Sequence, residues 1–270
     1  MDYRFIPPNT KILVVLTQYK RKHLEKQLKA IYNQSIKPEY VVVFQNENHA
    51  EINDLKDLYP FIHIKSDYNT KYFGRFAACF TFPVDTCIVM DDDIIPGRKC
   101  LENYINESYK LNSIILGNSR NGYFNKSEHM RSIPDYGIRN ISLLTMFGGH
   151  IWAFKKDWLH YMFTIKPFTY ETAEDMHFSF SAKILGNISS YCGRQRNMDE
   201  SCDITNNSLA CDQFSSYTDE VTTPLRKNVE KYFMENFGLK HIEKHYLEDD
   251  NNPPPPPNLG IPVSRRRGRR

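Results

Sequence analysis

Two common sequence patterns are missing from this chain of 270 residues. Its six cysteines include no Cys-x-x-Cys pair, which argues against a structural zinc site. No glycine occurs between Leu16 and Arg21, after the first predicted strand, and the P-loop pattern is absent from the whole chain. The sequence therefore argues against a zinc module and against a P-loop nucleotide-binding protein.

Long apolar runs and a strong excess of one charge are missing as well. No stretch is long enough to span a bilayer, and residues 1–10 contain no apolar signal-peptide core, so we expect a soluble, cytoplasmic protein. The net charge of +3 arises in residues 265–270, because without these five arginines 30 basic residues face 32 acidic ones. A general nucleic-acid-binding surface is not indicated.

Short apolar runs alternate with amphipathic segments in the first half of the chain. The runs are apolar throughout, which indicates strands buried on both faces of a mostly parallel sheet, with helices on either side. The predicted strands are residues 11–18, 40–44, 61–64 and 86–90, and the predicted helices are residues 21–33, 52–58 and 72–82.

The second half predicts further strands of a mixed sheet and three helices. The strands are residues 113–116, 141–146 and 148–154, and the helices are residues 99–109, 172–185 and 225–237. Residues 193–223 are polar and irregular. We expect one α/β domain over residues 8–247, followed by a disordered Pro- and Arg-rich tail at residues 248–270.

Three consecutive carboxylates, Asp91, Asp92 and Asp93, follow the apolar run of residues 86–90. Like charges at the end of a buried strand repel one another and favour a bound cation. Carboxylate oxygens suit Mn²⁺ or Mg²⁺, which share their remaining positions with phosphate and water. The alternative is a solvated acidic turn, but the apolar residues on both sides favour a site.

Four segments occur in an order that is typical of one enzyme family. They are Leu-Thr-Gln-Tyr-Lys-Arg at residues 16–21, Asn-Thr-Lys-Tyr-Phe-Gly-Arg at residues 69–75, Val-Met-Asp-Asp-Asp at residues 89–93, and the pair Glu174-Asp175. With these segments the chain resembles the exostosin-like glycosyltransferases, over roughly residues 11–191. Without a preceding membrane anchor it is more similar to soluble relatives encoded by large algal viruses, which would place it in the host cytoplasm.

The resemblance implies a GT-A fold, a Rossmann-like mixed sheet that is mostly parallel in its N-terminal half. Residues 8–117 would form the nucleotide-binding half and residues 118–247 the acceptor half. The implied activity is metal-dependent transfer of a sugar from a UDP-sugar donor to a hydroxyl of a glycan or glycoconjugate. UDP-xylose and UDP-N-acetylhexosamine are the first donors to consider.

The resemblance also implies roles in donor binding. Asp93 would be the direct ligand of Mn²⁺ or Mg²⁺ together with Asp91, and Asp92 would help to hold the ribose and the metal's water shell. Arg75 would meet the diphosphate or the sugar, since a guanidinium pairs two phosphate oxygens at once. Other predicted nucleotide-sugar contacts are Thr17, Tyr19, Arg21 and Asn69. Arg21 and Arg75 could instead be surface charges, and Asn69 a helix cap.

Glu174 and Asp175 carry the predicted chemistry. Read without the resemblance, Thr172 and Asp175 could form a capping box, and acidic residues are favoured at a helix N-terminus. The resemblance implies that the pair faces the acceptor hydroxyl and the anomeric carbon. Asp175 is the preferred reacting carboxylate, either as a base or as a stabiliser of positive charge, and Glu174 comes second.

A further segment, Gly149, His150 and Trp152, is predicted to bind the acceptor, with the indole stacking on a sugar ring. A core tryptophan beside a bend is the alternative. His177 is a candidate additional metal ligand, or else a packed histidine. Two other functions stay open: a sugar nucleotidyltransferase, which the missing glycine loop disfavours, and a non-catalytic carbohydrate-binding protein on the same fold.

Overall fold

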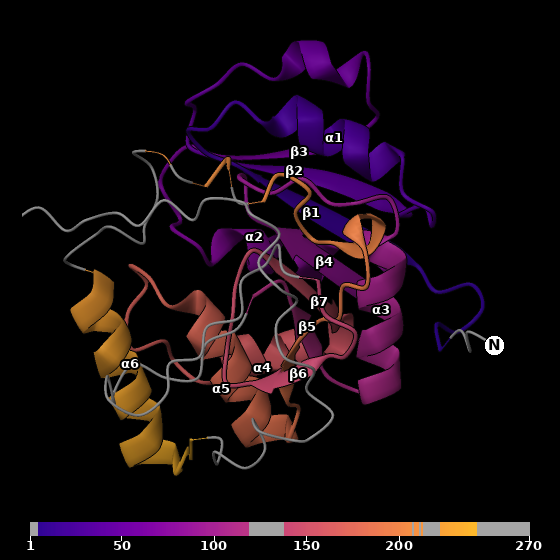
Figure 1. Cartoon of the computed structure of the whole chain (residues 1–270). Helices are drawn as coiled ribbons and strands as arrows, with labels where there is room; N and C mark the ends of the chain where they lie inside the picture. The colour runs from indigo at the N-terminus through magenta and orange to yellow at the C-terminus, as the bar shows by residue number, and fades with distance from the viewer. Residues whose placement is uncertain (1–4, 119–137, 207, 211, 213–221, 242–270) are drawn as a thin grey trace, which may run out of the picture.

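The computed structural model describes residues 5–118, 138–206, 208–210, 212 and 222–241 (Figure 1). The predicted tail lies outside them. The described residues form one mixed sheet of eight strands in the order β3-β2-β1-β4-β7-β5-β8-β6, with helices on both faces. The predicted α/β fold class is confirmed.

The first half of the sheet is parallel. Its strands are β1 (Ile12–Gln18), β2 (Tyr40–Asn46), β3 (Ile62–Ser66) and β4 (Thr86–Met90). β1 lies between β2 and β4, and all three pairings are parallel. The four predicted strands are confirmed, and their carboxyl ends meet at one edge of the sheet, where open α/β sheets bind ligands.

The helices of this half are shorter than their patterns predict. α1 covers Leu24–Tyr32, and the apolar residues near position 55 form only a 3-10 turn, Asn53–Lys56. The predicted helix of residues 72–82 is a single α-turn, α2 (Gly74–Ala77), and a 3-10 turn, Ala78–Thr81. Burial of Phe76 and Cys79 against the sheet sets the shape of this segment more than helix propensity does.

The second half of the sheet turns antiparallel at β7 (Ile151–Lys155), which pairs with both β4 and β5 (Ile114–Leu116). Beyond β5 lie β8 (Ser190–Cys192) and β6 (Leu143–Thr145). The sequence predicted all of these except β8, whose Ser-Tyr-Cys sequence lacks the apolar run that marks the equally short β5 and β6. The mixed half therefore begins at β7, the strand next to β4 and its carboxylate triplet.

The helices of the second half are α3 (Cys100–Leu111), α4 (Leu159–Thr164), α5 (Glu174–Gly186) and α6 (Thr222–Phe237). All but the short α4 were predicted. A 3-10 turn, η4 (Met198–Glu200), is the one regular element described in the irregular segment after β8.

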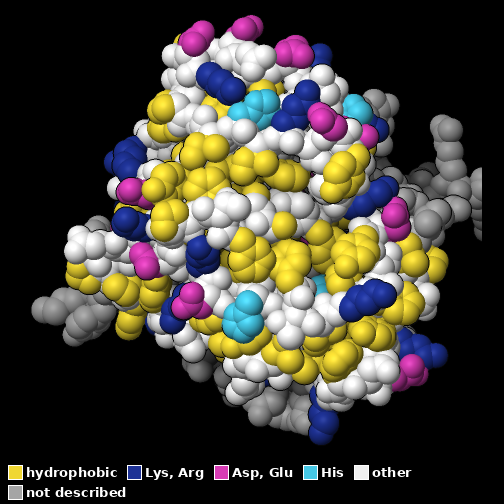
Figure 2. All heavy atoms as spheres, turned by 180° about the vertical axis from the view of Figure 1, so that it is seen from behind, with side chains coloured by type: hydrophobic (Ala, Val, Ile, Leu, Met, Phe, Trp, Pro, Cys, Tyr) yellow, Lys and Arg dark blue, Asp and Glu magenta, His cyan; other side chains and the backbone are white. Residues whose placement is uncertain are grey.

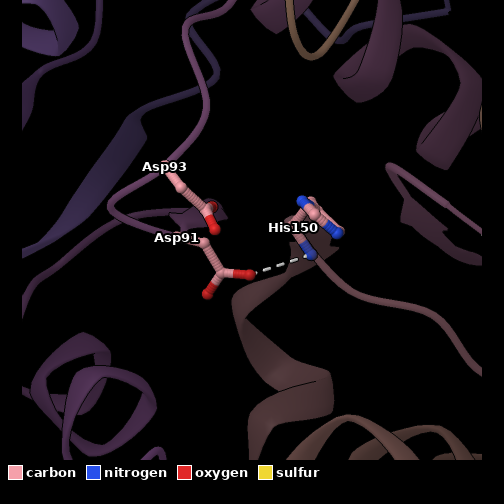
Figure 3. Close-up of side chains that lie close together, drawn as sticks. All are labelled: Asp91, Asp93 and His150. Carbon is pink, nitrogen blue, oxygen red and sulfur yellow. Dashed lines mark hydrogen bonds between the residues drawn. The ribbon is translucent and has the colours of Figure 1, made fainter. Parts of the chain in front are cut away.

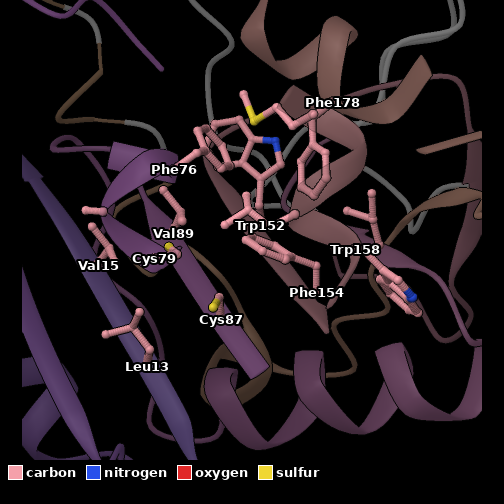
Figure 4. Packing of buried hydrophobic residues seen from close by; sticks show 14 of the residues in the cluster. Leu13, Val15, Phe76, Cys79, Cys87, Val89, Trp152, Phe154, Trp158 and Phe178 are labelled. Atoms are coloured by element: carbon pink, nitrogen blue, oxygen red, sulfur yellow. The ribbon is translucent and has the colours of Figure 1, made fainter. Parts of the chain in front are cut away.

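The core has a layer on each face of the sheet. Alternate residues of β1 point to opposite faces, so that Leu13 and Val15 join one cluster while Val14 and Leu16 join the other. The first layer, drawn in Figure 4, packs α2, α4 and α5 against β1, β4 and β7. The second layer packs α1 and α3 against the opposite face. Burial of both faces explains why the strands are apolar throughout.

The outer surface is mixed in character. Figure 2 shows a broad area of hydrophobic side chains on the face seen from behind, with charged groups around it. Exposed aromatic residues include Phe80 and Phe163, whose ring centroids lie 5.3 Å apart. Among the described helices, none combines the length and the apolar character needed to cross a bilayer.

Candidate active site

The carboxylate triplet lies directly after β4, at the carboxyl edge of the sheet. Asp92 and Asp93 are buried, with 9% and 8% of their surface exposed, and Asp91 is half-buried. The amide of Gln27, on the inner face of α1, donates to the carbonyl oxygens of Asp91 (2.7 Å) and Ile94 (3.0 Å). The turn is therefore held in place by hydrogen bonds from α1, and it is not a solvated acidic loop.

His150 joins this triplet through the register of the sheet. Met90 pairs with Ile151 across β4 and β7, so Asp91 and His150 are the next facing positions. The Asp91 N–H donates to the His150 carbonyl (2.9 Å), and the His150 N–H donates to Asp91 Oδ2 (3.1 Å), as Figure 3 shows for the second bond. His150 has a left-handed φ of 70°, which is uncommon for a non-glycine residue.

Asp91, Asp93 and His150 form a group with the chemistry of a metal site. Each offers one ligand atom, and these atoms all lie within 4.8 Å of one another (Figure 3). Asp93 Oδ1 is buried and has no hydrogen-bond partner among the described residues, which is costly unless something else pairs with it. Burial and the neighbouring Asp91 raise the pKa of Asp93 to about 7. Two carboxylates and an imidazole suit Mn²⁺.

Arg21 supplies positive charge beside this group. Its guanidinium donates to Asp92 Oδ1 (2.6 Å) and lies 3.2 Å from Asp93 Oδ2. The other side of the fork pairs with both oxygens of Asp212, at 2.7 and 2.9 Å. Arg21 was predicted to meet the nucleoside, and it lies instead between two carboxylates of the triplet and one from the irregular segment.

Arg75 connects the triplet to the second carboxylate pair. It is buried, and its guanidinium binds Asp91 and donates to Glu174 Oε1 (2.9 Å) and Thr17 Oγ1 (3.3 Å). Thr17 in turn donates to the Met90 carbonyl (2.8 Å), which ties the ends of β1 and β4 together. The guanidinium thus connects two carboxylates, and its contact with the diphosphate or the sugar stays a prediction.

Gly74 and Trp152 shape the surroundings of Arg75. A Cβ on Gly74 would lie 2.3 Å from Thr70 Oγ1 and 2.6 Å from the Phe44 ring, so only glycine allows α2 to approach the sheet this closely. The Trp152 ring lies 4.7 Å from the guanidinium carbon and is 1% exposed. Trp152 was predicted to stack on an acceptor sugar, but the structure places it in the core beneath Arg75, without an open face.

Glu174 and Asp175 begin α5. The residue before them, Ala173, is the N-cap, with a left-handed φ of 66° and no side-chain capping bond, so the alternative of a Thr172–Asp175 capping box is wrong. Glu174 is buried, and its Oε2 has no hydrogen-bond partner in the part of the chain that the structure describes. Burial, followed by the adjacent Asp175, raises the pKa of Glu174 to about 7, although Arg75 opposes this shift. The pair therefore begins the helix without a capping box, and Asp175 Oδ1 accepts from the Met176 N–H (2.8 Å) in the first turn.

Arg226, on α6, is a site residue that the sequence did not reveal. Its guanidinium donates to Asp175 Oδ2 (3.0 Å) and to Thr172 Oγ1 (3.3 Å). The segment between α5 and α6 showed no pattern that would bring the two helices together. Asp175 and Glu174, which are neighbours in the chain, therefore each pair with a different arginine.

A polar network lies at the ends of β1 and β2, where a nucleobase was predicted. Asn69 donates to the Tyr19 hydroxyl (3.0 Å) and accepts from the Asn46 amide (2.9 Å). The Tyr19 ring packs edge-on against His49, with centroids 4.7 Å apart. Asn46 was missed, although its place at the end of β2, beside the end of β1, was a signal that could have found it.

His177 does not lie with the metal group. Its Nε2 faces the carbonyl oxygens of Met162 (2.9 Å) and Ile165 (3.1 Å), and the ring packs between Phe73 and Phe233. Burial lowers its pKa to about 4, so the ring is neutral and donates from Nε2. The structure places His177 as a packed residue that joins α4 to α5.

The glycine pair before β7 is held by Asn118. Its Oδ1 accepts from the Gly149 N–H (2.7 Å), and a Cβ on Gly148 would meet the Asn118 carbonyl at 2.0 Å. A Cβ on Gly149 would have only ordinary contacts, the nearest with Trp152 at 3.7 Å. Gly149, predicted to bind the acceptor, lies next to His150 at the metal group.

Comparison with known proteins gives matches in structure only. No family model and no curated protein matches the sequence. S. aureus TarS 1-349 superposes with a TM-score of 0.50 at 15% identity, covering 87% of this chain and 76% of the other. The mannosyltransferase PcManGT from Pyrobaculum calidifontis, solved with GDP-Man and Mn²⁺, gives 0.50 at 16% identity, covering 72% of this chain and 56% of its own.

A longer S. aureus TarS chain gives a TM-score of 0.49 at 14% identity, covering 87% of this chain and 46% of its own. The chain thus spans about half the length of PcManGT and of this longer TarS chain. Identities this low establish shared architecture and no more. The mixed sheet and the superposition on PcManGT together show that the chain has the GT-A glycosyltransferase fold that was predicted.

Proposed function

We propose that this protein is a metal-dependent glycosyltransferase that uses a nucleotide-sugar donor. The observation that carries the proposal is the grouping of Asp91, Asp93 and His150 at the carboxyl edge of the sheet, with Glu174 and Asp175 linked to it through Arg75. A GT-A fold alone would not suffice, because folds host many functions. The grouping is what a transferase requires: a cation site beside buried acid groups.

Asp93 and His150 would hold the metal, with Asp91 as a third ligand. Asp93 Oδ1 is the best-placed ligand atom, since it is buried and unpaired, while Asp91 already accepts from Arg75 and from the His150 N–H. Mn²⁺ or Mg²⁺ bound there would neutralise the leaving diphosphate as a Lewis acid. Arg21 adds a second positive charge on the same side, beside Asp92 and Asp93.

Glu174 and Asp175 would act on the transferred sugar. Arg226 holds Asp175 in one orientation, so that this carboxylate can face positive charge at the anomeric carbon or accept the acceptor's proton. Glu174, braced by Arg75, holds that arginine against Asp91. Asp175 is therefore the proposed reacting carboxylate and Glu174 its support.

The donor nucleoside would lie over Tyr19 and Asn69, where ring and amide groups gather at the ends of β1 and β2. The resemblance to exostosin-like glycosyltransferases supports a UDP-sugar, with UDP-xylose and UDP-N-acetylhexosamine first. PcManGT was solved with GDP-Man, so guanine donors belong in the same test. The acceptor would be a glycan or glycoconjugate hydroxyl approaching His150 and Asp175.

The test is donor binding and turnover across a panel of UDP- and GDP-sugars, with Mn²⁺ and then with chelator. We expect metal-dependent binding of one nucleotide sugar and slow hydrolysis of that donor. Absence of binding to every donor in the presence of Mn²⁺ would contradict the proposal.

Asp93→Asn tests the site directly, and Asp54→Asn, an exposed carboxylate on the turn after β2, is the matched control. We expect Asp93→Asn alone to abolish metal-dependent donor binding while the protein stays folded. Glycan binding that survives Asp93→Asn, without turnover by the unaltered protein, would favour a carbohydrate-binding protein. Pyrophosphate release from a nucleoside triphosphate and a sugar phosphate would favour a nucleotidyltransferase.

A further inference from the structure

A cavity of about 650 Å³ lies on the far side of the carboxylate turn from Arg75. Its walls come from the outer face of α1, from Ile95 and the residues up to Arg98, from η4, and from Ile204. None of the residues of the candidate active site lines it. Its volume falls within the range of small-molecule sites.

Three cations border this cavity, and their helix spacing explains why they meet. Lys26 and Lys29 are three positions apart on α1 and therefore share a face, while Arg98 lines the same cavity from the turn after Ile95. All three are exposed, and within the described ranges none of them forms an ion pair. Asp199 is the one carboxylate of the lining, so the cavity has an excess of positive charge.

The part of the wall formed by Ile95, Met198 and Ile204 is apolar, and hydrogen bonds hold it in place. Ile95 donates from its N–H to Asp203 Oδ1 (3.2 Å) and accepts from the Ile204 N–H (2.8 Å). A Cβ on Gly97 would lie 2.1 Å from the Met198 carbonyl, so the two segments touch along their backbones. Ile204 and Met198 present 44% and 39% of their surface. The lining therefore combines three cationic residues with apolar side chains.

We propose that this cavity binds a ligand that carries a phosphoryl group on a partly apolar body. A phosphoryl group brings a charge of about −1.5 to −2 at neutral pH, which suits a cavity lined by three cationic residues. The apolar body would cover Ile95, Met198 and Ile204. The hollow is larger than a free phosphate ion needs. A small carboxylate carries a single negative charge and would compensate less of the positive charge of the lining. A lipid headgroup and a soluble sugar phosphate share this chemistry.

The site adjoins the carboxylate turn but is separate from it. α1 presents Lys26 and Lys29 to the cavity, while Gln27 on its inner face holds Asp91 and Ile94. Gln34, just after α1, donates to the Gly97 carbonyl (2.7 Å) in the cavity floor. The binding proposed here does not depend on the glycosyltransferase proposal, since no ligand of the metal group takes part.

The experiment is calorimetric titration of the full chain, in chelator, with two probes: dihexanoyl phosphatidic acid below its critical micelle concentration, and glucose 1-phosphate. The test variant is Lys26→Gln/Lys29→Gln. The matched control is Lys56→Gln/Lys65→Gln, which removes the same charge from exposed positions outside the cavity. Asp93→Asn serves as the control for binding at the donor site.

We expect at least one probe to bind, with an affinity that falls at least about tenfold in Lys26→Gln/Lys29→Gln and stays unchanged in both controls. Binding of phosphatidic acid alone would identify a lipid headgroup as the source, and binding of glucose 1-phosphate a soluble ligand. Failure of both probes to bind would overturn the proposal. So would binding that the Lys26→Gln/Lys29→Gln variant leaves intact, or that Asp93→Asn removes.

Discussion

Arg75 and Glu174, 99 positions apart in the chain, form an ion pair at 2.9 Å in which each side chain is 4% exposed. Arg75 also binds Asp91, so one buried guanidinium compensates two carboxylates from different halves of the fold. Buried charges of this kind contribute little net stability when complete but are costly to leave unpaired. The stability of the fold therefore depends on the pairing of Arg75 with these two carboxylates of the candidate active site.

Arg75→Met tests this dependence. Because it would leave Glu174 and Asp91 without their cation, we expect a loss of about 3–5 kcal/mol in the free energy of unfolding. Urea denaturation measures the change. Adding Glu174→Gln to Arg75→Met should recover part of the loss, since one buried charge is then removed. Two single variants whose effects simply add would contradict the pairing.

His150→Ala tests the proposed ligand that the register of β4 and β7 brings to Asp91 and Asp93. We expect Mn²⁺ affinity to fall at least about tenfold, as even supporting residues of metal sites have effects of that size. Electron paramagnetic resonance of free Mn²⁺ provides the measurement without any donor. His177→Gln should leave Mn²⁺ affinity unchanged. If His177→Gln weakened Mn²⁺ binding and His150→Ala did not, the ligand set would be wrong.

His177 should make stability depend on pH. The pKa of His177 is about 4 in the folded protein, against the ordinary histidine value of 6.5 for the unfolded chain. Between pH 4 and pH 6.5 the unfolded chain therefore binds more protons than the folded protein does. Stability is therefore lost as pH falls from 6.5 towards 4, by about 2 kcal/mol at pH 5. Urea denaturation at pH 7 and at pH 5 measures the free energy of unfolding. We expect this free energy to fall between the two pH values in the unaltered protein, and to fall by about 2 kcal/mol less in His177→Gln. An equal drop in both would refute the assignment.

Arg226→Met tests the placement of Asp175. This prediction rests on the proposed transferase activity. Since Arg226 touches the carboxylate and not the metal group, we expect kcat to fall about 10- to 100-fold with donor affinity unchanged. Steady-state kinetics and calorimetry separate the two effects. Lys231→Met, on the same helix and paired only with Glu235 among the described residues, is the control and should retain full activity. Equal losses in kcat and donor affinity would point to a general disturbance of α6.

The sequence predicted the fold well where the periodic signal was strong. The runs of residues 11–18 and 86–90 are buried on both faces, and both became central strands. β8 was missed because its Ser-Tyr-Cys sequence contains no apolar run, and α4 because six residues are too short to show a period. The predicted helix at residues 72–82 was too long, because packing of Phe76 and Cys79 overrode helix propensity.

For the candidate site, the sequence showed which side chains carry charge but not which of them meet. Asp91, Asp93 and Glu174 were all expected, and they are joined through Arg75. The partner of Asp175, Arg226, comes from a helix that no local pattern relates to α5. Charge pairing over such separations depends on the packing of whole elements, which a single sequence does not encode in any short pattern.

The antiparallel pairing of β4 with β7 has a consequence for how this site can vary. The distance between Asp91 and His150 is set by the main-chain bond from the Asp91 N–H to the His150 carbonyl, which continues the ladder beyond Met90 and Ile151, and by the bond from the His150 N–H to the Asp91 carboxylate. Side-chain changes in the core can therefore alter stability without altering this distance. A slip of one residue between the two strands would instead replace His150 by a glycine or an isoleucine, and would remove the imidazole at a single step. The spacing of the ligands is thus tolerant of substitution and intolerant of insertion.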